Sequence, residues 1–200
     1  MMAHPVFEHL LAEVRNAFAT TEALNTFCML PSQLDEQEVT PFHVPAADLM
    51  IADSMLAAEE TARLRDAFIA ASPQAQWRET YKGTRMGSDF MDKFGCYCLI
   101  GGGGPYTSDQ MGAYVVYMPP GLYYPFHHHP AEELYYILAG EAEFMLDGED
   151  NKVLRAGEHV FHPSNRPHAT QTHDKPFMAL VLWRGDLGTK PVLTYPEGDT

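Results

Sequence analysis

The chain has 200 residues, of which 46% are hydrophobic and 12% aromatic, and its net charge is −14. This composition can supply one sizeable core, and no apolar run is long enough to span a bilayer, so we expect a globular protein outside the membrane. The charge would repel phosphate backbones and anionic lipid surfaces, which argues against nucleic acid or a membrane as a partner.

The N-terminal segment and the cysteines indicate where the protein works. Residues 1–18 lack a basic segment followed by a continuous apolar stretch and a cleavage site, so we predict no secretory signal and a cytoplasmic location. Cys28, Cys96 and Cys98 form an odd set without C-x-x-C spacing. This pattern favours free, buried thiols over disulfides or a zinc–thiolate site.

The first part of the chain is predicted to be helical. Apolar residues recur at three- and four-residue steps over residues 5–18, and Pro5 suits the first turn of a helix. Two more helices are expected over residues 24–30 and 55–71, with a proline-containing connection between them. These helices either cover a sheet or form a lid over a pocket, and the sequence leaves both alternatives open.

From about residue 90 the pattern changes to short runs rich in Tyr, Val, Phe and Ile that are separated by turn residues, which predicts strands. The expected strands cover residues 94–100, 113–117, 122–129, 133–138, 141–146, 152–155, 159–162, 168–172 and 177–183. Asp147 and Gly148 are typical of a tight hairpin turn. We therefore expect a mainly β protein, either a sandwich or a jelly-roll barrel. Residues 1–90 would form an N-terminal helical extension packed on a barrel of residues 91–200, as one structural domain overall.

Two histidines and a glutamate are spaced so that they can meet at one point. His127 and His129 are two residues apart, so both imidazoles project to the same side of an extended strand. A turn after Pro130 would bring the Glu133 carboxylate back opposite them. Imidazole nitrogens and a carboxylate oxygen together suit one divalent metal ion, namely iron, manganese, cobalt, nickel or zinc.

Residues 121–140 resemble the first cupin motif, in which a glycine, two histidines one residue apart, a glutamate and a closing glycine occur at fixed separations. Residues 157–172 resemble the second cupin motif, although Asn165 stands where the family usually has glycine. Asparagine is among the residues that best tolerate a left-handed backbone at such a position. The resemblance implies a single cupin (jelly-roll) barrel, and it adds His168 to the three candidate ligands above.

Two neighbouring histidines are not assigned as ligands. His128 has the opposite strand parity from the histidines on either side of it, and His162 precedes a proline where the family has no ligand. We expect each of them either to lie on the surface or to contact a ligand side chain without binding the metal itself.

The chain also resembles a narrower family, the cupin-type dimethylsulfoniopropionate lyases of marine bacteria, of the DddQ type. The resemblance rests on residues 124–135, on His168, on Trp183 and on the helical extension before a single barrel. It implies a carbon–sulfur lyase that cleaves dimethylsulfoniopropionate, a small zwitterion, into dimethyl sulfide and acrylate. It also implies catalytic roles for Tyr135 and Tyr124.

This chemistry is a β-elimination that needs no organic cofactor. A metal that binds the substrate carboxylate would ease removal of a proton from the adjacent carbon, and a nearby cation would favour the phenolate of Tyr135 as the base. The sulfonium needs aromatic faces, so we expect Tyr123 and Trp183 to bind it. Tyr124 has the opposite strand parity from the histidine ligands, and its role therefore depends on a local bend at Pro125.

Two other functions remain open from the sequence. A mononuclear iron dioxygenase would use the same three histidines and glutamate, and oxygen consumption would distinguish it from a lyase. A non-catalytic cupin that binds a small ligand is disfavoured, because the chain has no attached DNA-binding motif and an unfavourable charge. The sequence also leaves open the identity of the metal and whether the protein is a homo-oligomer.

Overall fold

The structure, a computed structural model, describes residues 4–194, so residues 1–3 and 195–200, at the two ends of the predicted extension and barrel, lie outside the described part. The described helices are α1 Pro5–Thr20, α2 Glu22–Phe27, α3 Pro45–Ala52, α4 Ala62–Ala71 and α5 Ser88–Lys93, with a 3-10 turn at Ser72–Gln74. The strands are β1 Asp35–Glu36, β2 Gly95–Ile100, β3 Tyr106–Thr107, β4 Gly112–Met118, β5 Tyr123–His128, β6 Glu132–Leu146, β7 Lys152–Arg155, β8 His159–His162, β9 His168–Gln171, β10 Phe177–Arg184 and β11 Val192–Leu193.

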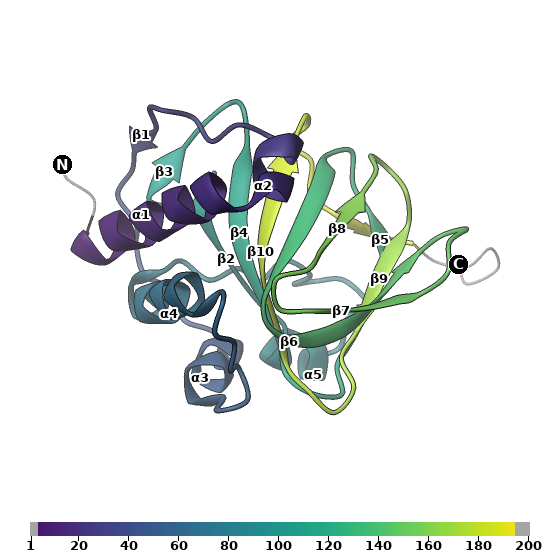
Figure 1. Cartoon of the computed structure of the whole chain (residues 1–200). Coiled ribbons are helices and arrows are strands. Elements are labelled where there is room, and N and C mark those ends of the chain that lie inside the picture. Colours follow the sequence, from purple (N-terminus) through teal and green to yellow (C-terminus); the bar gives the residue numbers. More distant parts are fainter. Residues whose placement is uncertain (1–3, 195–200) are drawn as a thin grey trace.

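The strands form two curved sheets that share β6 (Figure 1). The first sheet has the order β1-β3-β2-β4-β10-β6, and β8 pairs with the other edge of the same part of β6. In the second sheet the later part of β6 pairs with β7 and β9, and β5 and β11 follow. The expected mainly β barrel with an N-terminal helical extension is confirmed.

Strand β6 passes from one sheet to the other without ending. The sequence predicts two strands here, over residues 133–138 and 141–146, but the structure has one, with Gly140 at a φ of 71°. A Cβ on Gly140 would lie 1.8 Å from the Pro176 carbonyl oxygen, so both the backbone conformation and the close approach require glycine. The pairing of β10 with β6 also shifts by one residue between Met178 and Ala179. This local irregularity bends the strand, so that its two halves pair in different sheets.

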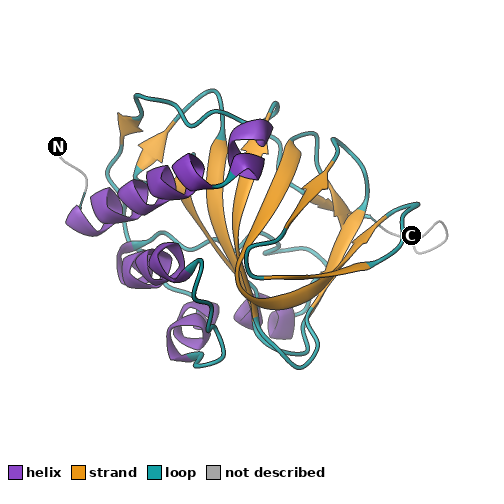
Figure 2. Cartoon of the chain, viewed as in Figure 1, coloured by secondary structure: helices purple, strands orange, loops and turns teal. Residues whose placement is uncertain are grey.

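Helices α1, α2, α3 and α4 lie on the outer face of the first sheet (Figure 2). Both faces of this sheet are therefore covered, as strand β4 shows. Its residues face the helices and the barrel interior in turn, and all of them are buried. Val115 and Tyr117 belong to the core between helices and sheet, whereas Tyr114 and Val116 belong to the core inside the barrel. These four helices therefore cover the sheet, which decides between the two alternatives left open by the sequence.

The helix boundaries differ from the prediction where polar side chains bind the backbone. The helix expected over residues 55–71 begins only at Ala62. Before it, the Asp53 carboxylate accepts hydrogen bonds from the Met55 amide at 2.9 Å and the Tyr117 hydroxyl at 2.8 Å, and this arrangement competes with a helical turn. The predicted helix over residues 24–30 instead spans Glu22–Phe27. No helix within residues 4–194 has the length and hydrophobicity needed to cross a membrane.

Three expectations about single positions are confirmed. Asn165, which stands where the second cupin motif usually has glycine, adopts the expected left-handed backbone with a φ of 58°. Asp147 and Gly148 lie in the turn between β6 and β7, where the Glu149 amide donates to the Leu146 carbonyl at 2.9 Å. The three cysteines are free thiols, and Cys96 and Cys98 are buried as expected, whereas Cys28 is only partly buried.

Candidate metal centre and active site

Strand pairing brings the four predicted ligands together inside the barrel. His127 on β5 lies opposite His168 on β9, and Glu133 on β6 joins them from the neighbouring part of the barrel. The Oε2 atom of Glu133 lies 3.5 Å from Nε2 of His129 and 3.3 Å from Nε2 of His168. All four side chains are buried, so the ligand atoms are shielded from bulk water.

The main chain fixes the orientation of each of the three histidine rings. Nδ1 of His127 lies 2.8 Å from the Pro125 carbonyl oxygen, and Nδ1 of His129 and of His168 each lies 2.9 Å from a backbone carbonyl oxygen. A carbonyl oxygen only accepts, so Nδ1 must carry the proton in each ring. In the neutral imidazole, Nε2 then presents its lone pair, which is the form that binds a metal ion.

The residues present fit a divalent cation. The Nε2 atoms of His129 and His168 are buried and have no hydrogen-bond partner, which is costly unless something else binds them. Potential ligand atoms of His127, His129 and His168 lie within 4.8 Å of one another, and so do those of Glu133, His162 and His168. Three imidazole nitrogens beside a carboxylate form a donor set typical of transition metals.

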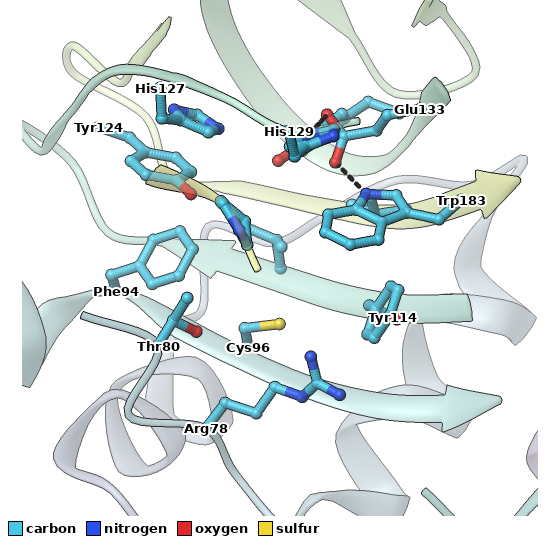
Figure 3. Close-up of a pocket in the computed structure, with 14 residues that line it drawn as sticks. Arg78, Thr80, Phe94, Cys96, Tyr114, Tyr124, His127, His129, Glu133 and Trp183 are labelled. Carbon is cyan, nitrogen blue, oxygen red and sulfur yellow. Dashed lines mark hydrogen bonds and ion pairs between the residues drawn. The ribbon is translucent and has the colours of Figure 1, made fainter. Parts of the chain in front are cut away.

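Two further side chains hold Glu133 in place. The Trp183 indole N–H donates to Oε1 of Glu133 at 2.6 Å (Figure 3). Nδ1 of His162 lies 2.8 Å from Oε2 of the same carboxylate. The ring of His162 also stacks on His168 at 4.1 Å between centroids. The sequence left two positions open for His162, on the surface or beside the ligands. His162 is fully buried, so it lies beside the ligands and supports Glu133.

The charges at this centre depend on one another. Burial opposes ionisation of Glu133, but the neighbouring His129, His162 and His168 outweigh it and hold the pKa of Glu133 well below its usual range. Burial opposes the charged form of His129 as well, but the Glu133 carboxylate outweighs it and raises the pKa of His129. Burial and the nearby His168 lower the pKa of His162 to about 4. Glu133 therefore supplies a negative charge inside the barrel.

Tyr124 lies beside the metal centre, because a bulge in β5 changes its direction. Between Tyr124 and His127, a stretch that contains Pro125 and Phe126, the pairing with β9 shifts by one residue, so Tyr124 and His127 come to the same side of the strand. Their rings stack at 3.9 Å between centroids. The Tyr124 hydroxyl shares a short hydrogen bond with the hydroxyl of Tyr81, a residue that the sequence analysis did not identify.

Tyr135 faces the same interior space but has different partners. Its ring packs against His162, Phe144 and Phe177, and among the described residues nothing forms a hydrogen bond with its hydroxyl. Burial, and then the charge of Glu133, raise the pKa of Tyr135 well above its ordinary value in the protein alone. An ionised Tyr135 therefore requires an additional positive charge nearby.

Tyr123 does not join this site, and the expectation that it binds substrate here is corrected. Its side chain is 42% exposed and lines a separate surface hollow with Arg85 and Phe126. The reason is strand alternation, since Tyr123 and the buried Tyr124 point to opposite sides of β5. His128 also points away from the centre, and its Nδ1 lies 2.8 Å from the Thr194 hydroxyl.

A cavity inside the barrel connects these groups, and we call it the inner cavity. One side of the lining consists of the metal ligands and their aromatic neighbours, namely His127, His129, Glu133, Tyr124, Tyr135 and Trp183. The residues that face the metal ligands in Figure 3 are Arg78, Thr80, Cys96 and Tyr114. The Trp183 ring packs on His129 at 4.4 Å and edge-on against Tyr114 at 5.5 Å between centroids. Burial raises the pKa of Cys96 to about 11, so its thiol stays protonated. Arg78, Thr80 and Tyr81 come from an irregular segment whose sequence has no periodic pattern, so sequence reasoning had no signal for them.

This protein has the features of a cupin with a metal-binding site. They are the β barrel, the helices on its outer face and the buried cluster of three histidines and one glutamate. Comparison with known proteins narrows the class. The family model of dimethylsulfoniopropionate lyase matches residues 19–179. The dimethylsulfoniopropionate lyase DddQ of Ruegeria pomeroyi DSS-3 is 62% identical over 195 residues, which cover 98% of this chain and 97% of that protein. The chain belongs to the dimethylsulfoniopropionate lyase family, so the expectation of a carbon–sulfur lyase is confirmed.

Solved structures agree with this assignment. The crystal structure of the DMSP lyase DddQ from Ruegeria pomeroyi DSS-3 matches with a TM-score of 0.95 and covers 98% of this chain and 99% of its own. A chain from the crystal structures of the DMSP lyases RdDddP and RnDddQII is 34% identical and matches with a TM-score of 0.91, over 96% of this chain and 98% of its own. The likeness thus extends to the helical extension as well as the barrel.

Proposed function

We propose that this protein cleaves dimethylsulfoniopropionate into dimethyl sulfide and acrylate by a metal-dependent β-elimination in the inner cavity. The observation that carries the proposal is the pair of buried, unpartnered Nε2 atoms of His129 and His168 beside the Glu133 carboxylate, next to a tyrosine whose hydroxyl is free. Membership in the dimethylsulfoniopropionate lyase family supports the choice of substrate.

His127, His129, Glu133 and His168 would hold one divalent ion, which is iron, zinc, manganese, cobalt or nickel by the donor set. Such an ion would supply a Lewis acid for the substrate carboxylate and a positive charge that favours a phenolate nearby. Trp183 and His162 keep both oxygens of Glu133 in place for this role. No organic cofactor enters the scheme.

Tyr135 is the base in this proposal. In the phenolate form, which a nearby positive charge would favour, its oxygen takes the proton from the carbon next to the substrate carboxylate and becomes a hydroxyl, and the electrons of that C–H bond form the new C=C bond. The C–S bond then breaks with both of its electrons going to sulfur, so neutral dimethyl sulfide and acrylate leave. Tyr135 is favoured over Tyr124 because its hydroxyl has no partner within residues 4–194, whereas the Tyr124 hydroxyl is already bonded to Tyr81.

The sulfonium end of the substrate meets aromatic rings. It is a permanent cation without a hydrogen-bond donor, and contact with a ring face contributes about 0.5–2 kcal/mol. Trp183 and Tyr124 line the inner cavity and contact ligand histidines, because Tyr124 stacks on His127 and Trp183 lies tilted against His129. We assign the sulfonium to these two rings.

The test is release of dimethyl sulfide into the headspace under anaerobic conditions, after dimethylsulfoniopropionate is added to metal-loaded protein. We expect equal amounts of dimethyl sulfide and acrylate without oxygen. A requirement for oxygen would instead favour the dioxygenase that the sequence left open. The domain division at residue 90, the cytoplasmic location and the oligomeric state stay predictions.

A further inference from the structure

Arg78 occupies a fixed position at the wall of the inner cavity. Its backbone amide donates to the Cys96 carbonyl at 2.8 Å, and the preceding Trp77 forms a β-bridge with Tyr97, so this segment is attached to the edge of β2. The side chain reaches past Cys96, and Figure 3 shows the guanidinium group directed toward Tyr114. Its central carbon lies 4.7 Å from the centroid of the Tyr114 ring.

The charge of Arg78 is not balanced by any carboxylate within residues 4–194. Its guanidinium donates to the Gly102 carbonyl at 2.8 Å, which uses one of its five N–H groups. Other arginines of the chain form ion pairs: Arg63 with Glu13, Arg65 with Asp66, Arg155 with Glu141, Arg166 with Glu149 and Arg184 with Glu132. Arg78 thus differs from these five arginines, in a protein with 27 acidic side chains.

Two hollows meet at this residue. A second and larger one, which we call the outer hollow, has a volume of about 560 Å³ and includes the backbone of Gly101 and Gly102. It shares Arg78, Thr80, Tyr114, Trp183 and Pro191 with the inner cavity. A small molecule that moves through this junction toward the metal ligands therefore comes close to the guanidinium group.

We propose that Arg78 binds the carboxylate of the incoming zwitterion, and of the departing acrylate, at the junction of the two hollows. A guanidinium pairs with a carboxylate through two parallel N–H···O bonds, and its charge repels a sulfonium. Arg78 therefore turns the substrate so that the carboxylate enters first and the sulfonium follows. This inference rests on the proposed function for the identity of the substrate, but its anion-binding part does not.

The experiment compares Arg78→Gln and Arg78→Lys with the unaltered, metal-loaded protein. We expect Arg78→Gln to weaken the binding of acrylate by about tenfold to a hundredfold, as loss of a charge-assisted hydrogen bond does, and Arg78→Lys to retain part of the affinity. The KM for dimethylsulfoniopropionate should rise with kcat nearly preserved, because Arg78 contributes to binding and takes no part in proton transfer or C–S cleavage. Calorimetry with acrylate and headspace kinetics provide the two readouts.

Two controls separate charge recognition from a structural effect. Arg155→Gln removes an equal charge from a surface ion pair and should leave acrylate affinity unchanged. Trimethylsulfonium lacks a carboxylate, so Arg78→Gln should not weaken its inhibition. Acrylate affinity within twofold of the unaltered protein, or equal losses for acrylate and trimethylsulfonium, would show that Arg78 only anchors the Gly102 loop. If the unaltered protein released no dimethyl sulfide, the proposed function would fail, while acrylate binding would still decide the role of Arg78.

Discussion

The hydrogen bond from Trp183 to Glu133 makes a quantitative prediction about metal affinity. Trp183→Phe removes the indole N–H but keeps an aromatic ring in the inner cavity. The lost bond is 2.6 Å long, is buried and ends on a carboxylate that is held ionised. Hydrogen bonds to charged groups contribute about 1.5–3 kcal/mol, and each 1.4 kcal/mol is a factor of about ten. We therefore expect the metal to bind about tenfold to a hundredfold more weakly, which is the range seen when supporting residues of metal ligands are removed.

Competition with a chromogenic chelator measures this change, and the chain offers a matched control. Trp77 is the second tryptophan, and its indole N–H donates at 3.2 Å to the Ser72 carbonyl, away from the ligands. Trp77→Phe should lower the free energy of unfolding by about 1 kcal/mol, because it also loses a buried hydrogen bond, but should leave metal affinity unchanged. Metal affinity within twofold of the unaltered protein in Trp183→Phe would refute the role of this hydrogen bond.

The remaining predictions concern the base, the ligands, the fold and pH. Tyr135→Phe should lower turnover by about 10²- to 10⁴-fold with metal content nearly preserved, and near-native turnover of the fully metallated variant would move the base to another residue. His129→Ala and Glu133→Ala should each remove most of the metal in elemental analysis, and full occupancy in both would reject the ligand set. Gly140→Ala places a Cβ at 1.8 Å from a carbonyl oxygen and should lower the free energy of unfolding by more than about 1 kcal/mol in urea denaturation. His162 has a folded pKa of about 4, below its ordinary value, so the unfolded chain binds the proton first. The stability of the metal-free protein should therefore fall as pH drops from about 6.5 toward 4, and His162→Gln should flatten that profile.

The sequence predicted the parts of the structure that depend on regular alternation. Strand periodicity located most strands, and the spacing of His127, His129 and Glu133 was enough to bring them together, since the fold provided the expected turn between β5 and β6. The resemblance to the second cupin motif added His168 to the ligands, and the structure places it opposite His127. The grouping of His127, His129 and Glu133 follows from residue type and separation, whereas His168 was identified only through the family resemblance.

Other features depended on single local interactions that alternation does not encode. The bulge between Tyr124 and His127 brought Tyr124 inward, and strand parity alone would have pointed it away. The continuity of β6 through Gly140 depends on a backbone conformation that a sequence pattern would interpret as a turn. Helix α3 is only eight residues long, too short for a clear helical period. Arg78 lies in irregular chain, where its contacts are set by the tertiary structure.

The carbonyl groups that orient the histidine rings have a consequence for how this centre tolerates substitution. Each acceptor belongs to a residue two positions away in the chain, namely Pro125 for His127, Ala131 for His129 and Arg166 for His168. Every amino acid carries a backbone carbonyl, so replacing one of these neighbours leaves the acceptor in place as long as the local backbone keeps its path. In many metal sites a carboxylate side chain accepts the hydrogen bond from the ligand histidine, so a single substitution of that residue removes the acceptor. Here the main-chain path keeps the proton on Nδ1 of each ligand histidine. Side chains around the ligands can therefore be replaced without changing which nitrogen faces the metal site.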